Sequence, residues 1–410
     1  MPLPNWPYLT ADLPGIGGRI KESLDDFRVD ELPLYEPCGE GSHVYFRIAK
    51  AGVPTPVAVE RIARYMGVRP TDIGLAGLKD AQATTTQMLS LEHADPVKLA
   101  AYRDAQVQVT WTGRHGNKLR PGHLAGNRFA VRIRGAGQAQ LAAAQAVLEV
   151  LKRRGVPNYF GPQRFGARGE TAELGAALVR GDLAEFLAVY LGRSAPADPP
   201  DCRAARDAFD AGYLDRALQL WPRHYGNERR ALSAWKRSSR PGPAIAAIDK
   251  RMRRLFVSAF QSRIFNDALA RRLGDIDKVW EGDLAEKADN GAIFAVADAA
   301  AEQPRAERFE ISPTGPIVGF RGKLAEGPMG QIEREVLAAT NINQDDFRRV
   351  GTLKVKGGRR SLRFAMGSPT LSAGRDGRGE FLELAFTAPS GCYATVALRE
   401  IMKVDSEASE

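Results

Sequence analysis

Apolar and polar residues alternate along residues 19–50, which is the pattern of short β-strands. Val44, Phe46 and Ile48 occupy every second position of one segment, and Phe27 and Val29 do so in an earlier one, before the pattern slips at a proline. A period of two places such side chains on one face of a strand. Residues 128–135, RFAVRIRG, alternate again. The first part of the chain is therefore predicted to be rich in strands.

Two segments in this part have helical spacing instead. Residues 138–155, QAQLAAAQAVLEVLKRRG, end in basic residues and Gly155, which is typical of a helix C-terminus. Residues 55–68 follow a Thr-Pro start signal and place apolar side chains on one side of a helix, namely Val57, Val59, Ile62, Ala63 and Met66.

The character of the chain changes after Gly155. Up to about residue 340, alanine-rich helical stretches dominate, such as TAELGAALVRGDLAEFLAVYLG. Strand-like pieces return near the end, in LRFAMG and GEFLELAFTAPSGCYATVALREIM. A length of 410 residues favours two cores. The order of strands, helices and strands predicts a discontinuous outer domain with a second domain inserted into it.

Composition excludes several classes of protein. A hydrophobic content of 44% argues against intrinsic disorder. No apolar run approaches the roughly 20 residues that span a bilayer, and the segment MPLPNWPYLTADLPG lacks the features of a signal peptide. We therefore expect a cytoplasmic protein without a membrane segment.

Metal, phosphate-loop and nucleophile motifs are missing from the sequence. The three cysteines and five histidines include no pair with metal-ligand spacing. The chain has no GxSxG elbow, no Walker A loop and no GxGxxG opening a helix after a strand. Zinc catalysis and the commonest hydrolase, kinase and dinucleotide-binding functions are thereby disfavoured.

The formal net charge is +9, which favours an acidic partner such as nucleic acid, although basic surfaces also serve solubility alone. Basic residues are interleaved with residues that can stack on a base, around Arg120 and around Arg164 beside Phe165. Such a mixture suits a surface that follows an RNA backbone. We take Arg120 and Arg164 as candidates for backbone contacts.

The stretch GLKDAQATTTQML places Asp80 between an apolar run and three threonines. A lone carboxylate in that position suggests a function. Other clusters combine polar residues with glycine, and each alone is most often only a turn. Taken together and in order, these clusters resemble the motifs of the TruD family of pseudouridine synthases: IKESLDDFRVDE, GLKDAQATTTQ, RPGHLAGNRF, NYFGPQRFG, FQSRIFN, PTGPIVG and GCYATVALRE.

The resemblance implies an α+β fold. It consists of a pseudouridine-synthase catalytic domain on a mixed, largely antiparallel sheet, with an inserted helix-rich α/β domain. We expect the catalytic domain in residues 1–154 together with 366–410 and the insertion in residues 155–365. This agrees with the order of strands and helices inferred from the pattern of the chain.

The resemblance also implies roles for individual residues. Asp80 corresponds to the catalytic aspartate and Lys21 to its basic partner. Asn127 would orient the pocket, and Phe129 would stack on the base. Tyr393 would be a further pocket aromatic; its neighbour Cys392 departs from the family pattern and is interpreted as a small-residue replacement.

Lys79, beside the catalytic aspartate, has two interpretations that the sequence leaves open. Its side chain either contacts an RNA phosphate or serves the local fold, because consecutive side chains of a strand face opposite ways. We retain Lys79 as a third candidate for a backbone contact.

The resemblance implies isomerisation of uridine in tRNA, at position 13 of the D-arm for bacterial members. The reaction exchanges no electrons or groups with another molecule, so we expect no cofactor, no metal and no obligate protein partner. The uridine must leave the stack to be reached. A carboxylate can serve as nucleophile or as base at the ribose. Two alternatives stay open, a non-catalytic tRNA-binding or chaperone protein and a synthase acting on another RNA.

Overall fold

The computed structural model describes residues 6–353 and 355–404. The chain forms two compact units, with unit 1 comprising Met1–Leu9 and Pro157–Arg363, and unit 2 comprising Thr10–Val156 and Phe364–Glu410. The divisions fall at 156/157 and 363/364, against expected positions of 154/155 and 365/366. The first residues differ from the expectation because Trp6 stacks on Tyr159 of unit 1, at 5.9 Å between ring centroids, and donates a hydrogen bond to Asp267.

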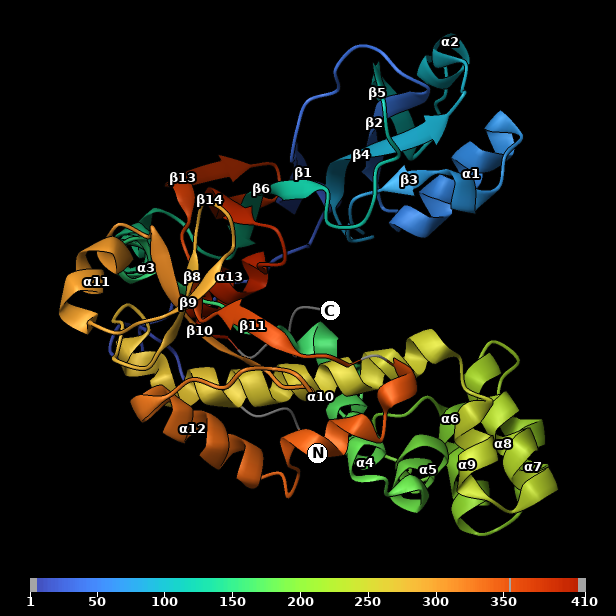
Figure 1. Ribbon diagram of the computed structural model, residues 1–410. Coiled ribbons are helices and arrows are strands. Elements are labelled where there is room, and N and C mark those ends of the chain that lie inside the picture. The colour runs from blue at the N-terminus through green and yellow to red at the C-terminus, as the bar shows by residue number, and fades with distance from the viewer. Residues whose placement is uncertain (1–5, 354, 405–410) are drawn as a thin grey trace. The chain divides into compact units, whose positions relative to one another are not determined.

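Unit 2 is built on an eight-stranded sheet (Figure 1). The strand order is β13-β14-β6-β1-β4-β2-β5, with β3 also paired to β4. The β1–β4 pair is parallel and the other pairs are antiparallel, which confirms the prediction of a mixed, largely antiparallel sheet. The strands are β1 (Phe27–Pro33), β2 (His43–Ala51), β3 (Gly74–Leu75), β4 (Thr84–Glu92), β5 (Val107–His115), β6 (Leu124–Arg134), β13 (Gly367–Asp376) and β14 (Gly379–Pro389).

The helices of unit 2 are α1 (Thr55–Met66), α2 (Pro96–Ala100), α3 (Leu141–Arg154) and α13 (Ala394–Met402). The apolar side of α1 forms one core with Phe46, Ile48 and Leu89 of the sheet. The helix ends at Gly67, whose φ of +76° is left-handed and favours glycine. The predicted helices over 55–68 and 138–155 therefore form.

The end of the chain corrects one expectation. The stretch from Gly379 onward had a strand-like pattern throughout, but only Gly379–Pro389 is a strand and Ala394–Met402 is the helix α13. A turn at 390–393 separates the two elements. Beyond it, the two less buried residues of the helix, Thr395 and Arg399, are four positions apart, so burial follows helical spacing.

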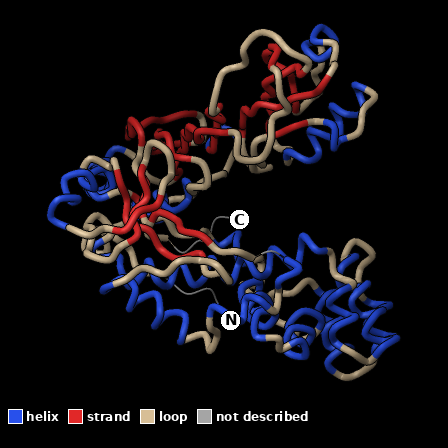
Figure 2. Tube along the Cα trace, viewed as in Figure 1, coloured by secondary structure: helices blue, strands red, loops and turns tan. Residues whose placement is uncertain are grey.

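Unit 1 combines a four-stranded antiparallel sheet with a helical part (Figures 1 and 2). The sheet order is β11 (Gly358–Ser361), β10 (Ile311–Ile317), β8 (Leu284–Lys287) and β9 (Ile293–Ala295). The chain enters through β7 (Val156–Pro157) and leaves through β12 (Arg363–Phe364). The helices are α4 (Thr171–Arg180), α5 (Leu183–Leu191), α6 (Pro200–Asp210), α7 (Leu214–Leu220), α8 (Gly226–Ser238), α9 (Pro241–Ala246), α10 (Lys250–Arg272), α11 (Ala299–Glu307) and α12 (Gly327–Ala338).

The long helix α10 organises unit 1, because it packs against α4, α12 and β10. Gly175 lets α4 approach α10 closely. A Cβ atom at this position would overlap the carbonyl oxygen of Phe256 on α10. The glycine is therefore explained by packing.

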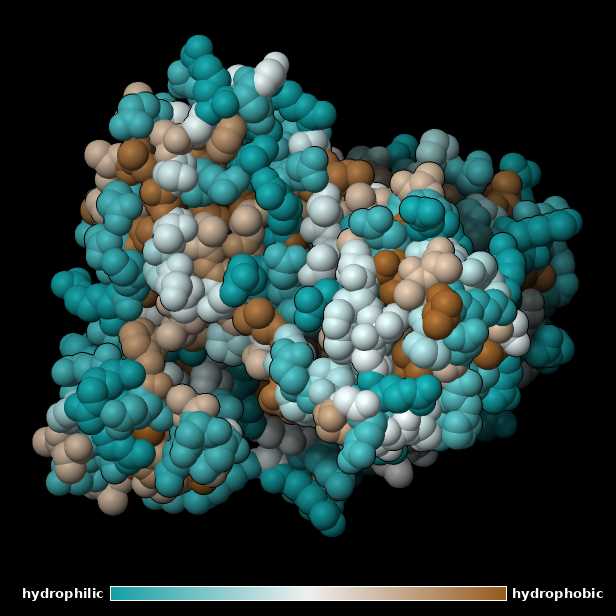
Figure 3. Space-filling view, turned by 90° about the horizontal axis from the view of Figure 1, so that it is seen from above, coloured by the Kyte–Doolittle hydropathy of each residue, from teal (hydrophilic) through white to brown (hydrophobic). Residues whose placement is uncertain are grey.

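Large exposed apolar residues are scattered through the sequence, from Leu24 to Ile293. The face seen in Figure 3 likewise mixes hydrophilic side chains with small hydrophobic spots. Within residues 6–353 and 355–404, no helix is long and apolar enough to cross a membrane.

Candidate active site

The loop of residues 76–83, between β3 and β4, carries Asp80. The Asp80 side chain is 44% exposed, and its Oδ2 lies 3.3 Å from Nζ of Lys21, whose side chain is largely buried. The same ammonium lies 4.8 Å from the centroid of the Phe27 ring. Lys21 has a φ of +61°, a left-handed conformation that costs energy for a residue with a Cβ. The structure thus brings Lys21 and Asp80 together, at a point of backbone strain.

A continuous row of side chains crosses the sheet beside this loop. Strand pairing aligns Lys50 of β2 with Thr85 of β4, Val29 of β1, Phe129 of β6 and Phe386 of β14. Paired residues on neighbouring strands point to the same face of a sheet. This row therefore places a buried lysine and two buried aromatic rings on one face.

Phe129 lies inside the fold. Its side chain is buried, and its ring contacts those of Phe27 and Phe386, at centroid distances of 6.5 and 5.3 Å. A role in stacking on a base stays a prediction. Asn127 is two residues earlier on β6, so its side chain projects from the same face as Phe129.

Lys79 belongs to a buried cluster. Its Nζ lies 2.8 Å from Oε2 of Glu31 and donates a 2.7 Å hydrogen bond to Oδ1 of Asn127. The other oxygen of Glu31 accepts a hydrogen bond from the backbone N–H of Met88. Both charged side chains are almost fully buried. This geometry favours the second interpretation of Lys79, a role in the local fold, over a contact with RNA phosphate.

A second buried lysine lies beneath the loop. Nζ of Lys50 donates to the main-chain carbonyls of Val53 and Asp80, both at 2.8 Å, and to that of Lys79 at 3.4 Å. Burial lowers the pKa of Lys50 to about 8; the nearby charge of Asp80 raises it and that of Lys79 lowers it.

Thr55, the first residue of α1, holds the same loop from another side. Its Oγ1 accepts a 2.9 Å hydrogen bond from the backbone N–H of Lys79 and donates one of 2.8 Å to Oε1 of Gln87. The loop is thus attached to β2, to α1 and, through Gln87, to β4.

The remaining predicted residues are more dispersed. Arg120 is exposed in the loop that precedes β6, and this loop bonds to the loop of Asp80 through Gly122 N–H and the Ala76 carbonyl, at 2.9 Å. Tyr393 is the residue before α13. Arg164 belongs to unit 1, where its guanidinium bonds to Ser258 and Ser262 of α10. The roles of Tyr393, Arg120 and Arg164 stay predictions.

Sequence reasoning missed Lys50 and Glu31, although the pattern contains a signal for both. Lys50 continues the series Val44, Phe46, Ile48 on the inward face of β2. Glu31 likewise follows Phe27 and Val29 on β1. A charged residue at an inward position of an alternating strand requires a partner, because an unpaired buried charge is costly.

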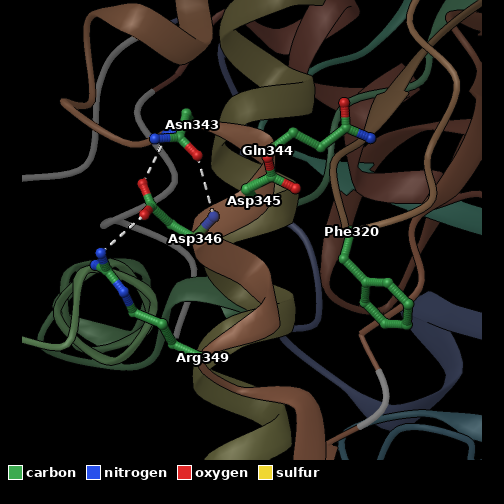
Figure 4. A pocket seen from close by; sticks show the side chains of 6 residues that line it. All are labelled: Phe320, Asn343, Gln344, Asp345, Asp346 and Arg349. Atoms are coloured by element: carbon green, nitrogen blue, oxygen red, sulfur yellow. Dashed lines mark hydrogen bonds and ion pairs between the residues drawn. The ribbon is translucent and has the colours of Figure 1, made fainter.

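A hollow of about 700 Å³ lies in unit 1 (Figure 4). It is lined by Phe320, Asn343, Gln344, Asp345, Asp346 and Arg349. Asp346 pairs with Arg349 at 3.2 Å and exchanges backbone–side-chain hydrogen bonds with Asn343, so these groups cap a short helix. The hollow carries none of the residues expected in the active site.

Within the described part of the chain, no group of three or more histidine, cysteine or acidic side chains is placed to hold a metal ion. A reaction without metal or cofactor stays a prediction.

Comparison with known proteins gives a consistent result. The family model described as tRNA pseudouridine synthase D (TruD) matches residues 5–401. A tRNA pseudouridine synthase D of Geobacter metallireducens is 46% identical over 397 residues, covering 97% of each chain. One from Anaeromyxobacter sp. is 39% identical over 406 residues, covering 98% of each. The crystal structure of a protein assigned as tRNA pseudouridine synthase D of Methanosarcina mazei superposes with a TM-score of 0.85 at 27% identity, over 99% of both chains.

Proposed function

The chain belongs to the TruD family of tRNA pseudouridine synthases, and on that premise we propose that it isomerises uridine 13 of the tRNA D-arm with Asp80 as the catalytic carboxylate. The observation that supports the role of Asp80 most directly is its pairing with Lys21. An exposed carboxylate is held 3.3 Å from an ammonium whose side chain is mostly buried. The positive charge of this ammonium lies beside the carboxylate that either catalytic role would use.

The reaction rearranges bonds within one nucleotide. The bond between C1′ of the ribose and N1 of uracil breaks, the base turns, and a bond between C1′ and C5 forms. C5 loses its proton and N1 gains one, so atoms and electrons balance without a co-reactant. Asp80 serves this scheme either by attacking C1′ or by accepting a proton from the ribose.

A buried ring and an amide of β6 are proposed to supply the other requirements of the reaction. A flipped uracil needs an apolar face for stacking and polar groups for its edges. Phe129 and Asn127, which share one face of β6, are proposed to provide these two functions. Basic residues such as Arg120 and Arg164 are proposed to contact the tRNA backbone, and no cofactor is required.

The test uses a transcribed tRNA labelled with tritium at C5 of uridine, because each isomerisation releases that label. The wild-type protein is expected to release tritium from a tRNA with uridine at position 13 and none from the same tRNA with cytidine there. Asp80→Asn keeps the shape of the side chain and removes its charge, so release is expected to fall below detection while tRNA affinity stays within a few-fold.

Asp12→Asn is the matched control, since Asp12 is an exposed aspartate of the same unit. It is expected to behave as the wild type. Turnover by Asp80→Asn at a substantial rate would exclude Asp80 as the catalytic carboxylate. Equal release from both tRNAs would exclude position 13, and binding without any release by the wild type would exclude catalysis.

A further inference from the structure

We propose that Lys50 is a positioning residue of this active site, whose buried ammonium holds the main chain of residues 79–80 and thereby sets the position of the Asp80 carboxylate. The inference rests on the proposed role of Asp80. It concerns a lysine that has no contact with the Asp80 carboxylate and that is not part of the motif that carries Asp80.

The geometry uses all of the lysine's hydrogen-bonding capacity. An ammonium has three donors, and Lys50 is bonded to three carbonyls, those of Val53, Lys79 and Asp80. Two of these carbonyls are consecutive in the chain. Because both converge on one nitrogen, the orientation of the peptide unit between Lys79 and Asp80 is fixed. Lys50 is 2% exposed, so its contribution acts through the loop and not by contact with RNA.

Burying a charged lysine at this position of the sheet costs free energy. Its neighbours along the inward face of β2 are Ile48 and Phe46, and an apolar side chain there would avoid the cost of burying a charge. Burial lowers the pKa of Lys50 to about 8, which shows that the protonated form is disfavoured in this position. An apolar replacement would, however, leave the loop carbonyls without donors. The presence of a lysine at position 50 is therefore explained by its hydrogen bonds to the loop carbonyls, and not by packing of the core.

Thr55 holds the same loop by accepting a hydrogen bond, whereas Lys50 holds it by donating hydrogen bonds. Thr55 accepts the N–H of Lys79, while Lys50 donates to the carbonyl of Lys79. Gln87 in turn accepts the hydroxyl proton of Thr55. The segment that carries Asp80 is thus held on both its N–H and C=O groups by residues of β2, α1 and β4, which are regular elements. Catalytic groups need support of this kind, because a displacement of about 1 Å can cost on the order of 100-fold in rate.

The first experiment measures single-turnover tritium release at saturating tRNA, together with tRNA affinity, for Lys50→Met. The rate is expected to fall about 100-fold with affinity within twofold of the wild type. Lys403→Met is the matched control. Lys403 also bonds to a main-chain carbonyl, that of Glu400, and burial also lowers its pKa, but it belongs to the C-terminal end of α13. Its rate is expected to stay within twofold of the wild type.

The second readout is the pH dependence, which a purely structural role would not change. The charged groups that face Lys50 are Asp80 and Lys79 of the loop. Since the pKa of Lys50 is about 8, the ammonium is present below pH 8 and is lost above it. The ratio of the wild-type rate to the Lys50→Met rate should therefore be constant from pH 6.5 to 7.5 and fall towards pH 9.5. Ionisation of the tRNA affects both proteins and cancels in this ratio.

Thr55→Val tests independently whether the loop must be held, because valine has nearly the same shape as threonine but no hydroxyl group. It removes the acceptor of the Lys79 N–H, and the rate at saturating tRNA is expected to fall about tenfold, again without a change in affinity. If Lys50→Met does not fold, the outcome for Thr55→Val decides. A wild-type rate in that variant, or a Lys50→Met rate equal to that of Lys403→Met, would overturn the inference while leaving the role of Asp80 intact. A wild-type protein that releases no tritium would instead overturn the proposed function and this inference with it.

Discussion

Each of the two units contains a cluster of buried charges, and the two clusters differ in how their charges are balanced. In unit 1, the cluster consists of two arginines and two acids. Arg168 lies 2.9 Å from Asp198 and 2.8 Å from Glu170. Arg206 lies within 4 Å of the same two acids. Burial raises the pKa of Glu170, and the two arginines lower it in turn. Each charge in this cluster has a partner of opposite sign.

In unit 2, the cluster consists of Lys21, Glu31, Lys50, Lys79 and Asp80. Lys79 and Glu31 form a buried pair at 2.8 Å, whereas Lys50 is bonded only to carbonyl groups. Three of the five side chains are cations and two are acids, and Asp80 is the only one of the five that is substantially exposed.

The difference separates a structural cluster of charges from the proposed active site. In the unit 1 cluster, the two arginines and the two acids pair with one another within the fold. In the unit 2 cluster, Lys21 lies 3.3 Å from Asp80, whose side chain is 44% exposed, so one charge of the cluster faces the solvent. The volume of a hollow does not distinguish a functional site from a structural one. The 700 Å³ hollow of unit 1 is lined by charged groups that pair with one another, such as Asp346 and Arg349.

The largest expected effect tests the structural cluster. Asp198→Asn leaves Arg168 and Arg206 without one partner, and we expect the free energy of unfolding of unit 1 to fall by about 3 kcal/mol. Urea unfolding followed by tryptophan fluorescence measures this loss, because four of the five tryptophans lie in unit 1, namely Trp6, Trp221, Trp235 and Trp280.

The control is Asp215→Asn, which breaks an exposed pair with Lys236 in the same unit. Its effect is expected to stay below about 1 kcal/mol. Under conditions where Asp198→Asn is folded, its rate at saturating tRNA should equal that of the wild type. If Asp198→Asn were fully folded but slow, the unit 1 cluster would also affect the reaction, and the proposed contrast between the two clusters would be wrong.

The next effect concerns Lys21. Lys21→Met is expected to lower the rate at saturating tRNA by about 100-fold, a size typical for removing one charged donor from a preorganised site. Lys21→Gly should be equally slow, yet about 1 kcal/mol more stable than Lys21→Met, because glycine adopts a φ of +61° without strain. Thermal unfolding compares the two variants, and equal stability would show that the left-handed backbone carries no strain.

A smaller effect is expected for the aromatic face. Phe129→Leu should slow the reaction about tenfold, since stacking of a base on an aromatic ring contributes roughly 1–3 kcal/mol. Phe386→Leu is the control, because Phe386 is the paired ring on β14 and its loss removes similar packing. Equal rates for the two variants at saturating tRNA would assign Phe129 to the core alone.

The smallest effect is expected for the exposed basic surface. Arg120→Ala should reduce the slope of log affinity against log salt by up to about one unit and leave the rate at saturating tRNA unchanged. Arg69→Ala is the control, because Arg69 is also exposed but is paired with Asp72 three residues away. The measurement is tRNA binding at several salt concentrations, and identical slopes for the two variants would exclude a phosphate contact for Arg120.

Much of the fold was predictable because its elements carry local signals. The alternation in β2 and the helical spacing of α1 are properties of contiguous residues, and both elements form as predicted. The local pattern gave the wrong prediction at Ala394–Met402, because apolar residues are so dense there that both the strand period of two and the helical period of 3.6 fit the sequence. Burial against the rest of unit 2 decided for a helix.

The site was predictable in part and for a different reason. The resemblance supplied Lys21 and Asp80, which the fold brings together across 59 positions. The residues that support Asp80 escaped notice because their meaning depends on strand pairing. The alternation of β2 marks Lys50 as a charged residue on an inward face, but only the pairing of β2 with β4 shows that it lies beneath the loop.

The pairing of β6 with β14 has a consequence for synthesis of the chain. Phe129 is paired with Phe386, so the whole of the inserted segment leaves the ribosome before this part of the sheet can close. At about 5–20 residues per second, the edge of β6 waits on the order of 10–50 seconds for its partner. An open strand edge invites pairing with other nascent chains, and alternating charges discourage it. Arg128, Arg132 and Arg134 alternate with the apolar residues of β6, an arrangement that discourages such pairing while the edge is open.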